Sequence, residues 1–222
     1  MTEQRKKVMI VDDHPLIRQG VARLVQQEQD LAICGEAEDT AEAIEAIAAT
    51  RPDIVVLDIT LKTSNGVELL AMLHKRFPDL PVLILSMHDE AIYAERTLRA
   101  GARGYVMKKD SPEKLIEAIR RVLAGEVYLS EAMTARVLKK IADGMPPQEP
   151  SPQDMLSARE LEVFRLIGQG TATRDIADRL QVSVKTVDAH RANIKKKLDL
   201  KSGAELVQHA IKWVLSQEKA SG

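Results

Sequence analysis

Five polar residues in the first half of the chain stand at the ends of short apolar runs: three aspartates, a serine and a lysine. Polar side chains in such positions can take part in catalysis or ligand binding. The five residues are Asp12, Asp13, Asp58, Ser86 and Lys108. Carboxylates 4 Å apart repel each other by about 4 kcal/mol per pair at an effective dielectric constant near 20. A divalent cation such as Mg²⁺ would relieve this repulsion, because it prefers oxygen ligands. A carboxylate nucleophile beside a metal, an ammonium group and a hydroxyl group is typical of phosphoryl transfer.

These residues can meet only if the apolar runs are neighbouring strands. The runs are VMIV from Val8, LAIC from Leu31, IVVL from Ile54, VLIL from Val82 and GYVM from Gly104. Each is apolar at nearly every position, which is typical of strands covered on both faces in a parallel sheet. Helix-period segments separate them, and we predict an α/β fold with a doubly wound five-stranded parallel sheet. Such sheets place functional groups at the carboxyl ends of their strands.

Helix and linker signals divide the chain. Ser111 and Pro112 predict the start of a helix, with Ser111 able to cap it, and this helix should end near Gly125. The segment 144–154 contains four of the nine prolines and is typical of a semi-rigid linker. We therefore predict a first domain over residues 1–127, a helical segment and proline-rich linker over 128–153, and a second domain over 154–222.

The stretches VMIVDDHP, IVVLD followed by Gly66, LILSMHDE and RAGARGYVMKKD resemble the receiver domain of bacterial response regulators, over about residues 7–127. The resemblance implies the flavodoxin-like strand order 2-1-3-4-5. It also implies that a sensor histidine kinase phosphorylates Asp58 and that Lys108 contacts the phosphoryl oxygens.

The same resemblance implies a metal site and a conformational switch. The Mg²⁺ ligands would be Asp12, Asp13, Asp58 and the main-chain carbonyl of Thr60, and the switch pair would be Ser86 and Tyr105. The chain departs from many receivers in having Ile59-Thr60-Leu61-Lys62 after the acceptor and Lys109 after the active-site lysine. These departures concern the loop geometry and the lifetime of the phosphoryl group.

From Leu156 onward the pattern is purely helical, which predicts a separate all-α domain of four helices. Two short helices flank the turn Gln181-Val182-Ser183, the spacing of a helix-turn-helix. In the second of these helices, a 100° step per residue places Val187, Ile194 and Leu198 toward the core. The opposite face carries Lys185, Ala189, Ala192 and Lys196, so small residues at its centre could approach a DNA groove while basic residues at its margins reach phosphates.

The stretches LSARELEVFRLIGQG, IADRL and VSVKTVDAHRANIKKKL resemble the LuxR-type DNA-binding domain of the NarL/FixJ response regulators. We therefore expect this helix to bind double-stranded DNA through Lys185, Thr186, Asp188, Ala189, Arg191, Ala192, Lys195, Lys196 and Lys197. Asp188 either accepts a hydrogen bond from cytosine or complements the helix N-terminus.

The resemblance also implies that the last helix forms a homodimer on activation. The residues expected in the dimer contact are Val207, His209, Ala210 and Ile211. Trp213 lies off the apolar stripe of this helix, and we expect it to be exposed. RNA polymerase is a further expected partner.

Composition narrows the classes of protein to which the chain can belong. No apolar stretch approaches the roughly 20 residues of a membrane span, and the N-terminus lacks a signal-peptide core, so we expect a cytoplasmic bacterial protein without membrane contact. The single cysteine, Cys34, is expected to be a core thiol. Residues 154–222 carry 12 basic and 9 acidic side chains, which permits a polyanionic partner.

The leading hypothesis is a DNA-binding regulator that is not an enzyme and that phosphorylation of Asp58 activates. Two alternatives stay open: a Mg²⁺-dependent phosphohydrolase or phosphotransferase with an aspartate nucleophile, and a DNA-binding regulator that works without phosphorylation. Turnover of generic phosphate esters, or the absence of an acid-labile phosphoryl adduct, would favour the first or the second alternative, respectively.

Overall fold

The chain folds into two compact units, residues 1–146 and 147–222, in a computed structural model that describes residues 5–61, 66–142 and 152–221. Most of the predicted linker, 144–154, therefore lies outside the described residues, as does Lys62. Among the described helices, none combines the length and the apolar character that crossing a bilayer requires.

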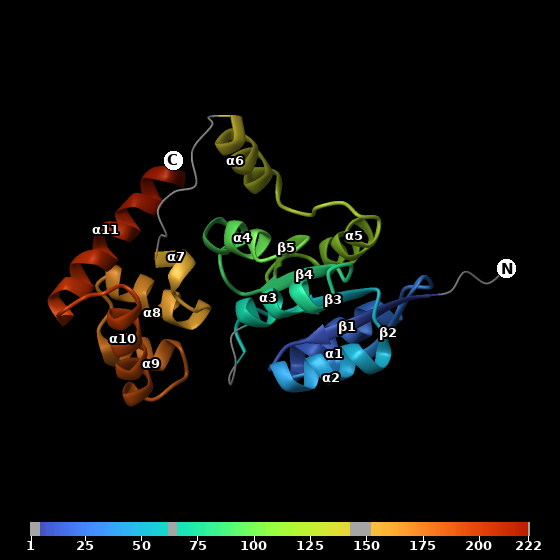
Figure 1. Cartoon of the computed structure of the whole chain (residues 1–222), viewed down its shortest axis with the longest axis horizontal. Helices are drawn as coiled ribbons and strands as arrows, with labels where there is room; N and C mark the ends of the chain where they lie inside the picture. The colour runs from blue at the N-terminus through green and yellow to red at the C-terminus, as the bar shows by residue number, and fades with distance from the viewer. Residues whose placement is uncertain (1–4, 62–65, 143–151, 222) are drawn as a thin grey trace. The chain divides into compact units, whose positions relative to one another are not determined.

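The first unit is built on a five-stranded parallel sheet in the order β2-β1-β3-β4-β5, as predicted (Figure 1). The strands are β1 (Lys6–Val11), β2 (Leu31–Ala37), β3 (Ile54–Leu57), β4 (Val82–Ser86) and β5 (Gly104–Met107). The helices between them are α1 (Pro15–Gln26), α2 (Thr40–Thr50), α3 (Gly66–Arg76) and α4 (Glu90–Arg99), and α5 (Pro112–Leu123) follows the last strand.

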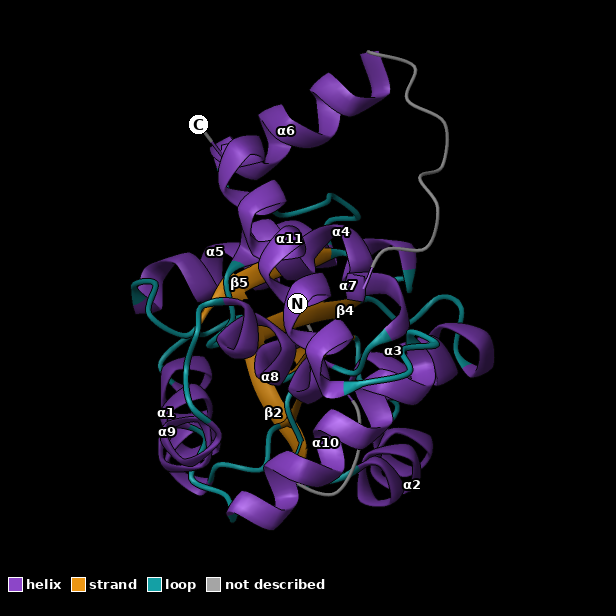
Figure 2. Ribbon diagram, turned by 90° about the vertical axis from the view of Figure 1, so that its left-hand side faces the viewer, coloured by secondary structure: helices purple, strands orange, loops and turns teal. Residues whose placement is uncertain are grey.

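Helices cover both faces of the sheet, which explains why its strands are apolar at successive positions (Figure 2). Val8 and Ile10 of β1 belong to one buried cluster with residues of α1 and α5. Their neighbours Met9 and Val11 are also buried, and they point to the opposite face because side chains alternate along a strand. The prediction of a doubly wound sheet is confirmed.

The segment after α5 is part of this unit. Gly125 ends the helix with φ +86°, and the main chain of Tyr128 then pairs with the edge strand, where the N–H of Tyr105 donates to its carbonyl at 2.9 Å. Helix α6 (Glu131–Ala142) packs against α4, and Glu90 accepts a hydrogen bond from the N–H of Ser130 at 2.9 Å. The predicted capping role of Ser111 is corrected: it occupies the N-cap position of α5, but its side chain makes no capping hydrogen bond to the main chain.

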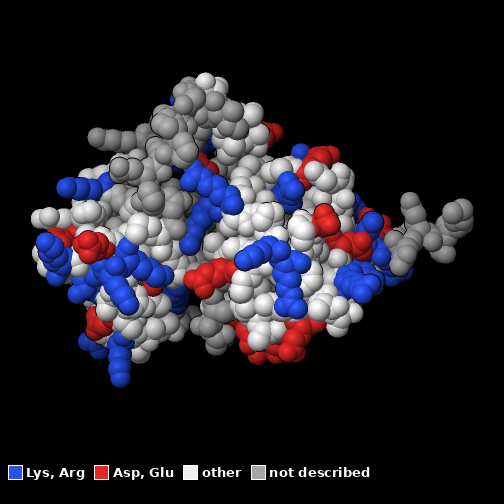
Figure 3. Space-filling model, viewed as in Figure 1, with Lys and Arg blue, Asp and Glu red and all other residues white. Residues whose placement is uncertain are grey.

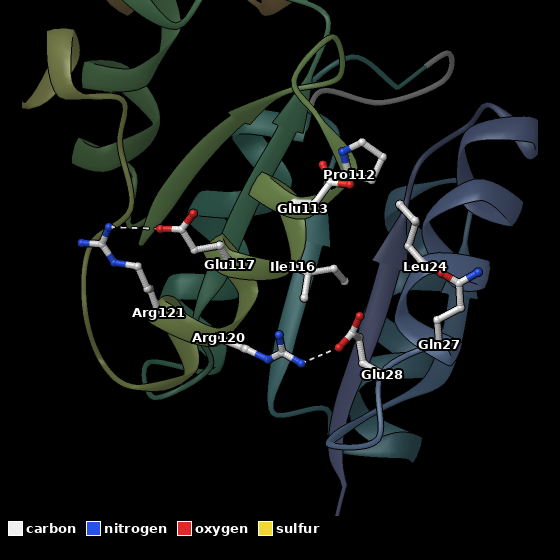
Figure 4. A pocket seen from close by; sticks show the side chains of 9 residues that line it. All are labelled: Leu24, Gln27, Glu28, Pro112, Glu113, Ile116, Glu117, Arg120 and Arg121. Atoms are coloured by element: carbon white, nitrogen blue, oxygen red, sulfur yellow. Dashed lines mark hydrogen bonds and ion pairs between the residues drawn. The ribbon is translucent and has the colours of Figure 1, made fainter.

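A groove runs between α1 and α5 (Figure 4). Its apolar floor includes Leu24 and Ile116. Charged side chains at its rim pair with one another, since Arg120 contacts Glu28 at 2.5 Å. The lining residues are Leu24, Gln27, Glu28, Pro112, Glu113, Ile116, Glu117, Arg120 and Arg121.

The second unit is entirely helical over its described residues, as predicted. Its helices are α7 (Pro152–Met155), α8 (Ala158–Gly168), α9 (Thr173–Arg179), α10 (Val184–Lys197) and α11 (Gly203–Ser221). Ser157 and Glu160 form a reciprocal capping box at the start of α8. Helix α11 packs on α8 so closely that a Cβ at Gly168 would lie 2.4 Å from the carbonyl oxygen of Ala210.

Two expectations for α11 were wrong because the face that packs in the domain core is displaced around the helix from the predicted apolar stripe: Leu206, Ala210 and Trp213 are buried, whereas Val207, Ile211 and Leu215 are exposed. Trp213 is buried rather than exposed, and its ring lies 5.8 Å from that of Phe164 between centroids. Ala210 has no exposed surface, so it belongs to the domain core and cannot lie in a dimer contact of the folded unit.

Candidate functional site

Three buried carboxylates meet at the carboxyl edge of the sheet. Asp12 and Asp13 follow β1 and Asp58 follows β3, and these strands are hydrogen-bonded neighbours. The side chains of the three aspartates, together with that of His14, offer ligand atoms that all lie within 4.8 Å of one another. The structure thus brings together three of the residues that the sequence pattern singled out.

Lys108 reaches the same cluster from the end of β5. Its Nζ lies 2.6 Å from Oδ2 of Asp12 and 2.6 Å from Oδ2 of Asp58, and its side chain is only 3% exposed. Burial by itself would lower the pKa of Lys108, but the charges of the two carboxylates outweigh burial and raise it. Lys108 is therefore held as an ammonium group against the carboxylates.

The surroundings of Asp58 shift the pKa of its carboxyl group. Burial raises its pKa to about 6, against the opposing charge of Lys108. The negative charge of Asp12 acts in the same direction as burial, whereas hydrogen bonds from Lys108 and from the N–H of Thr60 act against it. One ammonium group thus offsets only part of the electrostatic strain in the cluster.

The oxygen atoms of this cluster fit a hard divalent cation. Oδ1 of Asp13 is buried and receives no hydrogen bond from the described residues, although Nδ1 of His14 lies 2.7 Å away in an unsuitable direction. A buried carboxylate oxygen without a partner is unfavourable unless a cation or water satisfies it. Carboxylate oxygens are ligands that Mg²⁺ prefers.

The loops on either side of Asp58 are joined by hydrogen bonds that sequence reasoning missed. Oγ1 of Thr60 lies 2.6 Å from Nε2 of His88, and the carbonyl of His88 accepts a hydrogen bond from the Tyr105 hydroxyl at 3.0 Å. Ser86 is fully buried, and its Oγ accepts from the N–H of His88 at 3.3 Å. His88 therefore contacts the predicted ligand residue and both predicted switch residues; its place after the strand Val82–Ser86 predicted a neighbour of the site, but not these contacts.

Two further residues support the loops that carry the carboxylates. A Cβ at Gly66 would lie 2.4 Å from the carbonyl oxygen of Asp58, so only glycine lets α3 begin this close to the main chain. The sequence signal for it was its place after IVVLD. Nη1 of Arg18 donates to the carbonyl of Asp12 at 2.6 Å and supports the β1–α1 loop. No sequence signal pointed to Arg18.

In the helical unit, α10 presents the faces that its spacing predicts. Val187 and Ile194 are fully buried, whereas the predicted outer face is exposed: Lys185, Ala189, Ala192 and Lys196. Figure 3 shows basic side chains gathered over the region that α9 and α10 occupy in Figure 1. Basic side chains around an outer face of small residues suit the approach to a phosphate backbone.

The remaining α10 residues of the predicted DNA contact divide by their surroundings. Asp188 and Lys197 are exposed, whereas Thr186, Arg191 and Lys195 are partly buried. The first turn of α10 contains no acidic residue, so Asp188 lies too far along the helix to complement its N-terminus. Lys197 is not free, because its Nζ lies 2.7 Å from Oε2 of Glu160.

On α11, three of the four residues predicted in the dimer contact are exposed. Val207 and Ile211 are 36% and 40% exposed. His209, which lies between them in the sequence, is also exposed. Leu215 continues the exposed apolar row at 53%. The row covers one side of the helix at a spacing of four residues.

Two protein families match the two units. The family described as response regulator receiver domain matches residues 8–120, and the family described as bacterial regulatory proteins, luxR family, matches residues 154–210. The oxygen regulatory protein NreC of Staphylococcus epidermidis is 37% identical over 211 residues, which cover 93% of this chain and 97% of the relative.

Solved structures of RcsB are similar over most of both chains. RcsB of Salmonella enterica serovar Typhimurium bound to promoter P1flhDC, in the presence of the phosphomimetic BeF3-, is 25% identical, with a TM-score of 0.56. The similarity covers 93% of this chain and 98% of the RcsB chain. A structure of two RcsB dimers bound to two parallel DNAs is 25% identical with a TM-score of 0.57, over 96% of this chain and 99% of that chain.

Proposed function

Since the chain belongs to the two-component response regulators that join a receiver domain to a LuxR-type DNA-binding domain, we propose that phosphorylation of Asp58 controls its binding to DNA. The observation that carries this proposal is the contact of Lys108 with both Asp12 and Asp58 inside a buried carboxylate cluster. A sensor histidine kinase would supply the phosphoryl group. The domains proposed for these two roles span 1–127 and 154–222, joined by 128–153.

In the phosphoryl transfer, a carboxylate oxygen of Asp58 attacks the phosphorus of the donor. A new P–O bond forms while the bond from phosphorus to the donor atom breaks, and the electron pair of that bond stays with the donor. Lys108 already lies 2.6 Å from Asp58 and stabilises the negative charge on the transferred oxygens. Its fixed ammonium group needs little rearrangement during the step.

We propose that Asp12, Asp13, Asp58 and the main-chain carbonyl of Thr60 hold Mg²⁺. When bound, the metal supplies positive charge that offsets the repulsion between the carboxylates and the incoming phosphoryl group. The buried Oδ1 of Asp13, which accepts no hydrogen bond from the described residues, supports this assignment.

The switch is proposed to act through Ser86 and Tyr105. The hydroxyl of Tyr105 is bonded to the carbonyl of His88, in the loop that follows Ser86, and its N–H is bonded to Tyr128 beyond α5. A movement of Ser86 toward a phosphoryl group on Asp58 would therefore be transmitted to the segment leading to the second unit. Such a switch needs about 5.5 kcal/mol of differential stabilisation to move from 1:99 to 99:1, part of which dimer formation can contribute.

Double-stranded DNA is proposed to bind the outer face of α10. Ala189 and Ala192 would face the bases, and Asp188 would accept a hydrogen bond from a cytosine amino group. The proposed contacts to phosphate and sugar come from Lys185, Thr186, Arg191, Lys195 and Lys196. The homodimer is proposed to form through Val207, His209 and Ile211 of α11, and the DNA-bound dimers of RcsB support a paired arrangement.

The proposed function also indicates the cellular location of the protein and its other partners. A regulator that meets both DNA and a kinase is proposed to work in the bacterial cytoplasm, with RNA polymerase as a further partner. We propose that the chain modifies itself and does not turn over external substrates. The two alternatives, a phosphohydrolase and a phosphorylation-independent regulator, give different outcomes in the experiment below.

The test compares wild type with Asp58→Ala, with and without a small-molecule phosphodonor. We expect the donor to add an acid-labile phosphoryl group, to favour the dimer and to raise DNA affinity in wild type alone. The matched control is Asp79→Asn, which removes an exposed carboxylate of the α3–β4 loop and should respond to the donor like wild type. Equal, donor-insensitive affinities would reject the proposal, and turnover of phosphate esters would favour the hydrolase.

A further inference from the structure

Two consecutive residues at the start of α8 hold both helices of the helix-turn-helix. Nη2 of Arg159 donates to the carbonyl of Leu180, at the end of α9. Oε2 of Glu160 lies 2.7 Å from Nζ of Lys197, in the last turn of α10. Figure 1 shows α8, α9 and α10 as neighbours within this unit. The first turn of α8 is therefore a brace for the two helices.

Glu160 is a buried charge that needs a partner. It is 4% exposed, and one of its interactions is local, the capping box in which Oε2 accepts from the N–H of Ser157 at 2.8 Å. The ammonium group of Lys197, 37 residues away in the sequence, contacts this carboxylate. A buried carboxylate that loses its cation is strongly unfavourable, so the ammonium group of Lys197 is tied to this position.

The three lysines in the last turn of α10, Lys195, Lys196 and Lys197, therefore have different surroundings. Lys196 is exposed on the outer face, beside Ala189 and Ala192, whereas Lys197 turns back toward α8 and its side chain is 39% exposed. If Lys197 left Glu160 to bind a phosphate group, the carboxylate would stay buried without a cation. The gain of one phosphate contact would be offset by that loss.

We propose that Lys197 is a positioning residue, which fixes the last turn of α10 on α8 through Glu160 and does not bind DNA phosphate. This inference rests on the proposed binding of DNA by α10, and it replaces the expectation that Lys197 contacts DNA. Removing Lys197 or Glu160 should impair the presentation of α10 to the groove because each change breaks the same brace, and the loss of Lys197 also leaves the Glu160 carboxylate buried without a cation.

The salt dependence of DNA binding distinguishes the two roles. A lysine that contacts phosphate contributes about 0.9 to the slope of log affinity against log salt concentration on duplex DNA. We expect full-length Lys197→Gln to lower affinity about tenfold at every salt concentration while keeping the wild-type slope. The probe is a duplex selected from a random pool by the wild-type chain in the presence of a phosphodonor.

Glu160→Gln provides the second arm, because glutamine can still accept the capping hydrogen bond from Ser157 and so preserves the start of α8. We expect it to lower affinity by no more than Lys197→Gln does, because it leaves no buried charge unpaired, and the double variant to be no weaker than Lys197→Gln alone. Lys196→Gln is the matched control, for which we expect a slope lower by about 0.9. Fluorescence of Trp213 shows that each variant is folded.

A slope reduced by about 0.9 in Lys197→Gln would overturn the proposal, as would losses that add in the double variant. Failure of the wild-type chain to select any DNA would instead overturn the proposed function. The two failures are therefore distinguishable in one series of measurements.

Discussion

Replacing Gly66 by alanine should destabilise the receiver domain and distort the phosphorylation site. An ideal Cβ at this position would lie 2.4 Å from the carbonyl oxygen of Asp58, and 2.6 Å from Cα of Ile59. The obstructing atoms belong to the main chain and cannot rotate away as the end of a side chain could. Overpacking of this kind costs about 1–3 kcal/mol. With a urea dependence of about 2 kcal/mol per molar, a loss of about 2 kcal/mol lowers the unfolding midpoint by about 1 M.

The single tryptophan makes this effect measurable in the full chain. Trp213 belongs to the helical unit, so its fluorescence follows the unfolding of that unit, whereas far-ultraviolet circular dichroism follows both units. We expect Gly66→Ala to shift the midpoint of the receiver transition in circular dichroism and to leave the fluorescence transition in place. The extent of phosphorylation by a small-molecule donor should also fall, because the main chain at Asp58 must move.

Gly20→Ala is the matched control, since a Cβ at Gly20 meets no atom within 4 Å. Gly20 lies inside α1, where alanine is favoured over glycine by about 0.5–1 kcal/mol, so this variant should be slightly more stable than wild type. The reasoning is refuted if Gly66→Ala unfolds at the same urea concentration as wild type, or if it gains stability as Gly20→Ala does.

Three other predictions concern metal, pH and the last helix. Mg²⁺ at 100 times its dissociation constant should stabilise the receiver domain by about 2.7 kcal/mol in urea unfolding, and Asp13→Asn should abolish this gain; an equal gain in both proteins would contradict the assignment. Burial would raise the pKa of Glu160, but its hydrogen bonds and the charge of Lys197 lower this pKa overall. The ionised Glu160 therefore stabilises the fold fully above the ordinary pKa of a glutamate, and this stabilisation is lost as pH falls through the lowered pKa. The fluorescence midpoint of wild type should therefore fall on acidification below about pH 4.5, and that of Glu160→Gln should fall less; parallel curves would contradict this reasoning. Ala210→Leu should destabilise the helical unit by about 1–3 kcal/mol because Ala210 is fully buried. Ile211→Ser should instead weaken the dimer in sedimentation and leave the unfolding midpoint unchanged; the reverse pattern would restore Ala210 to the dimer contact.

Residue patterns along the chain were sufficient to predict the strands and the outer face of α10. A run such as Ile54–Leu57, apolar at each of its four positions, is buried on both sides only if helices cover both faces of the sheet. In α10, the 100° step placed Val187 and Ile194 inside and Ala189 and Ala192 outside, as the structure has them. Both predictions depend only on the geometry of one element.

Long-range partners could not be predicted in this way. The position of His88, in contact with Thr60 and Tyr105, depends on how the loops after two strands fold over Asp58. The burial of Trp213 depends on how α11 lies against α8. A helical stripe indicates that one side of the helix is apolar, but it does not indicate which part of the apolar surface the neighbouring helix covers.

The sequence by itself determined the order of the elements and the placing of Asp58 and Lys108 at strand ends, because hydrophobic periodicity and strand length are local properties. Only the tertiary structure decided that Lys108 contacts two carboxylates at once and that Lys197 pairs with Glu160. The physical reason is that a charged side chain takes the partner that satisfies a buried opposite charge. Which charges are buried together is known only when separate elements have packed.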